Sequence, residues 1–158
     1  LGGGIEFPAS QDASSNANTL DDYEEGDYTP TIVGSSSGNF VLNSSFNTLA
    51  YTKIGRQVTI MGEIRITSDN SASGDLRFSL PFAIDNLGQS SEYALGIVHL
   101  TGHGTTSIDS NKCFTYLTGG NQYFRIIHTA DDDTDTILTH AHVDGIWNVA
   151  FTLTYFSA

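Results

Sequence analysis

Tyrosines in the second half of the chain are the residues best suited to holding a ligand. Tyr93, Tyr116 and Tyr123 carry amphipathic rings that can stack on sugar faces, and the chain is rich in amide and hydroxyl side chains that bind sugar hydroxyls. Trp147 has the same chemistry, but it begins an apolar stripe and is expected in the core. The alternative for Tyr116 and Tyr123 is that they flank a hairpin and pair across its strands. The three tyrosines are therefore candidate ligand-binding residues for a neutral glycan.

His140, His142 and Asp144 form an H-x-H-x-D string with two metal interpretations. The string is similar to the zinc signature of the metallo-β-lactamase fold, but Gly145 stands where a further histidine is expected and the layered α/β pattern of that fold is absent. In the second interpretation, His140 and His142 share one face of a strand, and three copies of the chain surround a transition metal on a symmetry axis. The simpler alternative is a pair of exposed or interface histidines. We expect no cofactor, and His140 and His142 are the candidate metal ligands.

Other chemical motifs give little support for catalysis. Asp131, Asp132 and Asp133 begin a carboxylate-rich loop whose oxygens suit Ca²⁺, but the spacing is not that of an EF-hand, and a solvated hairpin turn is the alternative. The sequence contains no nucleophile elbow and no phosphate-binding glycine loop after a strand. No two acidic residues can be placed across a cleft from sequence alone, as a glycosidase would require. The sequence therefore predicts that the protein is not an enzyme.

Composition narrows the class of partner. The 158 residues carry a formal net charge of −12, with 6 Lys and Arg against 18 Asp and Glu, so the chain cannot form the basic surface that nucleic acids or anionic membranes require. No stretch approaches the roughly 20 apolar residues that span a bilayer, so we expect no membrane insertion. Cys113 is the single cysteine, lies in an apolar run and is expected in the core.

The elements that would position these side chains are β-strands. Apolar residues alternate with polar ones from residue 29 nearly to the end; in the strand expected over residues 56–67, Val58, Ile60 and Ile64 share one face. Gly62 falls on this apolar face, where it marks a bulge or a close approach. We therefore predict an all-β fold, an antiparallel β-sandwich or jelly-roll-like head domain.

The N-terminal segment differs in character from the head. Residues 1–28 are predicted to form an extended arm with one helical turn, Leu20–Glu25, which Thr19 would cap. This arm is predicted to join an upstream fibre or module, and residues 29–158 are predicted to form the head domain.

Two strings resemble a known family. GIEFPASQDASSNANTLDDYEEGDYTPTI at residues 4–32 and YTKIGRQVTIMGEI at residues 51–64 are similar to the C-terminal domains of tailed-bacteriophage tail fibre or receptor-binding proteins. The resemblance implies a homotrimeric head in an extracellular appendage of the virion, which attaches to the host through a cell-surface glycan or protein receptor. It assigns no binding residue, because recognition in such proteins usually sits in variable apical loops.

The leading hypothesis is thus a non-enzymatic, homotrimeric domain that recognises the bacterial surface, most simply its polysaccharide. One alternative is a purely structural virion component, such as a head decoration or a fibre-tip trimerisation cap. A second alternative is a glycan depolymerase. The host, the receptor and the binding loops are left open by the sequence.

Overall fold

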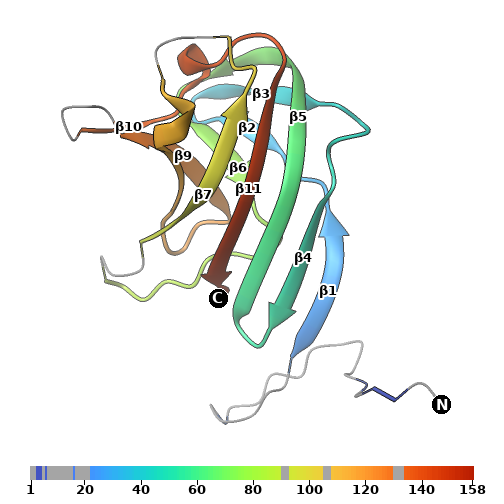
Figure 1. Cartoon of the computed structure of the whole chain (residues 1–158). Coiled ribbons are helices and arrows are strands. Elements are labelled where there is room, and N and C mark those ends of the chain that lie inside the picture. Colours follow the sequence, from blue (N-terminus) through green and yellow to red (C-terminus); the bar gives the residue numbers. More distant parts are fainter. Residues whose placement is uncertain are drawn as a thin grey trace.

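The computed structural model describes residues 3, 4, 6, 16, 22–89, 93–104, 108–129 and 134–158. In this part of the chain the strands all join one sheet (Figure 1). They are β1 (Tyr23–Tyr28), β2 (Ile32–Gly34), β3 (Ser37–Leu42), β4 (Leu49–Ile54), β5 (Gln57–Ser73), β6 (Leu76–Ser79), β7 (Ala94–Thr101), β8 (Cys113–Leu117), β9 (Tyr123–Thr129), β10 (Asp135–Ile137) and β11 (Trp147–Phe156). Short 3-10 turns η2 (Ser110–Lys112) and η3 (His140–His142) precede β8 and β11. None of the described helical segments has the length and apolar character needed to cross a membrane.

The sheet closes on itself into an antiparallel barrel of eight strands. Around the barrel the order is β5, β11, β7, β8, β9, β6, β2 and β3, and β3 then pairs with β5. Strands β1 and β4 extend the sheet beyond β5, and β10 pairs with β9. The predicted all-β class is confirmed, but the predicted sandwich or jelly roll is wrong. Two separate sheets do not form, because the β3–β5 pairing joins the last strand of the path to the first.

The long strand β5 belongs both to the barrel and to its extension. One edge of β5 pairs with β11 from Gln57 to Ile66, while the other edge pairs first with β4 and then with β3. Gly62 lies just beyond the part of β5 that pairs with β4, and its φ is 147°. A Cβ atom on Gly62 would lie 2.6 Å from Cδ2 of Leu49. The close approach predicted at this glycine is therefore confirmed.

The helical turn predicted for Leu20–Glu25 is wrong where the structure describes it. Residues 19–21 lie outside the described residues, and the following residues form β1, which pairs antiparallel with β4 along its whole length. The carboxylate of Asp22 forms an ion pair with Nζ of Lys53, which is buried on β4. Ladder hydrogen bonds and this ion pair stabilise the extended conformation and override the local capping pattern.

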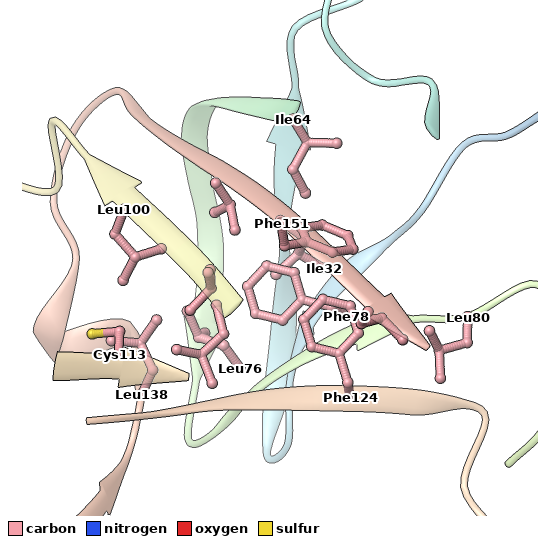
Figure 2. Packing of buried hydrophobic residues seen from close by; sticks show 14 of the residues in the cluster. Ile32, Ile64, Leu76, Phe78, Leu80, Leu100, Cys113, Phe124, Leu138 and Phe151 are labelled. Atoms are coloured by element: carbon pink, nitrogen blue, oxygen red, sulfur yellow. The ribbon is translucent and has the colours of Figure 1, made fainter. Parts of the chain in front are cut away.

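The barrel interior is filled by aliphatic and aromatic side chains (Figure 2). The indole of Trp147 meets the ring of Phe40 edge to face at 5.9 Å and that of Phe78 at 6.5 Å between ring centroids. Phe78 in turn stacks on Phe124 at 5.0 Å. Cys113 is also buried in this cluster. The predicted core positions of Trp147 and Cys113 are therefore confirmed.

Candidate functional site

The three tyrosines predicted to bind a ligand lie on one outer face of the barrel. Tyr93 immediately precedes β7, Tyr116 is on β8 and Tyr123 begins β9, and these strands are neighbours in the sheet. The rings of Tyr93 and Tyr116 lie 5.6 Å apart between centroids, tilted by 52°. The side chain of Tyr93 is 51% exposed. The fold thus brings together aromatic groups that are up to 30 residues apart in sequence.

Two arginines complete this outer surface. The guanidinium carbon of Arg125 lies 5.1 Å from the ring centroid of Tyr116, and that of Arg77 lies 4.8 Å from the ring centroid of Tyr123. Cation–π pairs at these distances hold both guanidinium planes against the sheet. We call Tyr93, Tyr116, Tyr123, Arg77 and Arg125 the tyrosine–arginine face. The sequence prediction missed both arginines, although each stands at an outward position of an alternating strand.

A cleft opens at the end of the barrel beside this face, and Tyr93 lines it. The cleft has a volume of about 360 Å³, which falls within the usual range for small-ligand sites. Its walls come from the loop after Ile84, from the start of β7 and from the ends of β8 and β11. The lining residues are Arg56, Ile84, Asp85, Leu87, Tyr93, Ala94, Leu117, Thr154, Tyr155 and Phe156. We call this the end cleft.

The end cleft combines apolar surface with a fixed pair of charges. Nη1 of Arg56 donates to Oδ2 of Asp85 at 2.6 Å, and the guanidinium carbon of Arg56 lies 5.6 Å from the ring centroid of Phe156. The backbone N–H of Asp85 donates to the carbonyl of Phe156 at 2.8 Å, which ties the loop to β11. A carboxylate, a guanidinium and exposed aromatic rings are the groups that bind sugar hydroxyls and sugar faces.

The phenol of Tyr155 lies at the inner side of the end cleft. Its hydroxyl donates to the carbonyl of Phe82 at 2.9 Å, and burial raises the pKa of Tyr155 well above its ordinary value. This hydroxyl therefore keeps its proton and remains a neutral, hydrogen-bonded group.

The predicted metal ligands lie elsewhere, in η3 before β11, at the top of the molecule in Figure 1. His140 and His142 belong to a 3-10 turn, so the prediction that they share a strand face is wrong. Nδ1 of His142 accepts the backbone N–H of Thr139 at 3.0 Å, which closes the turn. Burial lowers the pKa of His142. The metal site that three copies of the chain would share on a symmetry axis is not tested by a single chain, and it stays a prediction.

Metal chemistry within one chain finds no support in the described residues. In the described ranges, no three His, Cys, Asp or Glu side chains are grouped so that they could hold a metal ion. Residues 131–133 of the carboxylate loop lie outside the described residues.

Comparisons with known proteins give a fold but no family. No protein-family model matches the chain, and no curated protein sequence does. Among solved structures, the Dettilon tailspike protein (gp208) is similar, with a TM-score of 0.61 and 14% sequence identity over 86% of this chain. The chain spans 24% of that protein's length. The barrel is thus a fold that also occurs as one part of a phage tailspike protein.

This likeness overturns one sequence prediction. The lack of catalytic motifs predicted that the protein is not an enzyme, but tailspike proteins are typically enzymes that depolymerise glycans, and one of them contains this fold. Missing motifs are therefore no ground for excluding catalysis in this chain.

Proposed function

We propose that this chain is a domain of a phage virion appendage, and that it binds polysaccharide on the surface of the bacterial host. The observation that carries the proposal is the position of Tyr93. Its side chain is exposed and lies where the end cleft meets the tyrosine–arginine face. An extended sugar chain could place one residue in the cleft and stack the next on the outer tyrosines. The fold shared with part of a tailspike protein supports the assignment to an appendage.

We also propose that the domain functions as a homotrimer. Strands β7 and β11 contain no Asp, Glu, Lys or Arg, although the chain carries a net charge of −12. Away from the tyrosine–arginine face, outward residues on β7 and on neighbouring β5 include Ile97 (78% exposed) and Met61 (55%), which lie on either side of Thr152. A self-repelling acidic chain can associate most readily through an uncharged, apolar surface. Residues 1–28 would connect the trimer to an upstream fibre or module.

Glycan binding is tested with labelled protein on a panel of bacterial strains. Binding should be competed by polysaccharide extracted from a bound strain, and Tyr93→Ala should reduce binding at least ~10-fold, because stacking on one aromatic ring contributes about 1–2 kcal/mol. Tyr23→Ala is the matched control, since Tyr23 is exposed on β1 at the edge of the extended sheet. Equal losses in both variants would refute the placement of the site. Release of oligosaccharides from the bound polysaccharide would add a catalytic role.

Trimerisation is tested by light scattering. The mass should be three times 17.0 kDa, and Ile97→Asp should convert the trimer to monomer by burying three unpaired carboxylates. Val41→Asp is the control, because Val41 is also exposed but lies on β3. A wild-type monomer would refute this part of the proposal. A trimer that binds no bacterial surface would instead indicate a purely structural virion component.

A further inference from the structure

Two arginines of the tyrosine–arginine face form no ion pair with any carboxylate in the described ranges. The chain has only 6 Lys and Arg, and Arg56 in the end cleft is paired with Asp85. Among the described residues, no carboxylate forms an ion pair with Arg77 or Arg125, not even that of Asp75, two residues before Arg77. In so acidic a chain, two unpaired guanidinium groups on one surface require a reason.

Strands β6 and β9 place these two arginines on the same outer face of the sheet. β6 and β9 pair antiparallel, with Phe78 opposite Phe124 in the core. Arg77 precedes Phe78 and Arg125 follows Phe124, so both arginines lie on the outer face where this ladder ends, and Leu138 then hydrogen-bonds to both strands. Two like charges on one face of a sheet repel each other. An anion between the two guanidinium groups would remove that repulsion.

Both guanidinium groups are oriented before any ligand arrives. Arg77 lies over Tyr123 and Arg125 over Tyr116, at the distances given above. Nη2 of Arg125 donates to Oγ1 of Thr118 at 3.1 Å, which leaves its other N–H groups available. Nε of Arg77 is buried and has no acceptor among the described residues. Guanidinium groups held in this way are suited to binding the two oxygens of a carboxylate or phosphate.

We propose that Arg77 and Arg125 together bind an anionic group, a carboxylate or a phosphate, on a sugar of the host polysaccharide. Tyr116 and Tyr123, which flank the arginines, contact the faces of the same or the next sugar. This inference rests on the proposed function and refines it from a neutral to an acidic glycan. It also explains how a chain with a net charge of −12 can attach to an acidic surface, since the contact is confined to a face that carries two guanidinium groups.

The test uses polysaccharide extracted from a strain that the full chain binds. One portion is treated with carbodiimide and borohydride, which reduces carboxylates to alcohols, and another with cold hydrofluoric acid, which removes phosphate. Each portion then competes with intact cells for the labelled protein. One of the two treatments should weaken competition at least ~10-fold, and the treatment that does so identifies the anion.

Arginine variants link this chemistry to the face. Arg77→Gln and Arg125→Gln should each weaken binding of the native polysaccharide about 10-fold, and raising the salt concentration should weaken the wild type more than either variant. Arg65→Gln on β5 is the control, because it changes the net charge equally. Replacing both arginines with lysine keeps the charge but loses the planar fork, and should give intermediate affinity. Thermal melting verifies that each variant is folded.

Several outcomes would overturn the inference. It fails if both treated polysaccharides compete as well as the native one, or if the Gln variants bind like the wild type. If Tyr93→Ala loses binding while the Gln variants keep it, the proposed function stands and only the anionic site is wrong. If the chain binds no bacterial surface, the proposed function fails and this inference fails with it.

Discussion

Replacing Thr115 with valine should stabilise the protein, because the threonine hydroxyl is buried without a partner. Thr115 lies on β8 with its side chain inside the barrel, 0% exposed, and its Oγ1 has no hydrogen-bond partner among the described residues. The space beside it is occupied by β7: a Cβ atom added to Gly96 would lie 2.5 Å from this oxygen. The hydroxyl is thus removed from water with nothing to replace the lost hydrogen bond.

The size of the effect follows from the cost of that burial. An unsatisfied buried hydroxyl costs about 1–3 kcal/mol, and valine has nearly the shape of threonine, so Thr115→Val should raise the free energy of unfolding by about 1–2 kcal/mol. For a chain of this length, that corresponds to an increase in Tm of roughly 2–8 °C. Urea denaturation at one fixed protein concentration measures the change, since association would otherwise shift the midpoint.

Two controls make this prediction specific. Thr115→Ser keeps the unpaired hydroxyl and removes a methyl group, so it should destabilise by about 1 kcal/mol. Thr136→Val, on the exposed surface of β10, should change stability by less than about 0.5 kcal/mol. If Thr115→Val instead lowers the free energy of unfolding by 1 kcal/mol or more, the hydroxyl has a partner and the reasoning is refuted.

Three further predictions concern Gly62 on β5, the thiol of Cys113 and the turn before β11. Gly62→Ala should lower the free energy of unfolding by about 2–4 kcal/mol in urea, because of its positive φ and the contact with Leu49; an unchanged midpoint would contradict it. Burial raises the pKa of Cys113 to about 11, so a disulfide reagent at pH 8 should modify it only after denaturation, and fast labelling of native protein would contradict this. Because the pKa of His142 is lowered in the folded state, stability should fall as pH drops below about 6.5; His142→Asn should flatten that decline, and an unchanged pH dependence in this variant would contradict the prediction.

Strand positions and inward faces could be predicted from sequence because alternation alone determines them. Val58, Ile60 and Ile64 share the buried face of β5, and Trp147 begins the buried stripe of β11, as the pattern indicates. Each of these residues is apolar, and its polar neighbours would lose water if the strand turned over. This information is local, so it needs no knowledge of which strands are adjacent.

Closure of the barrel depends on pairing that the local pattern does not contain. A sandwich strand and a barrel strand have the same period of two, so alternation could not distinguish them. The deciding contact is between β3 and the end of β5, where Leu42 pairs with Ile66. The helical turn failed for a related reason, because the carboxylate of Glu24 accepts the hydroxyl of Tyr51 across β1 and β4. A capping pattern involves only residues that are close in sequence, so it cannot reveal such a contact.

In the candidate site, too, the residue types could be chosen from sequence, but the positions of their neighbours across the strands could not. The tyrosines could be chosen from sequence because an aromatic ring at an outward position is suited to stacking wherever the strand lies. The arginines could not, because their meaning comes from what lies across the ladder. Arg125 directly faces Tyr116 on β8, and Arg77 on β6 lies over Tyr123 of β9. On its own strand each arginine is an ordinary polar position, and only the assembled sheet places both on one face with the tyrosines. For a barrel of this kind, cations that stay unpaired across the register are therefore the signal to look for when the sequence contains no catalytic or binding motif.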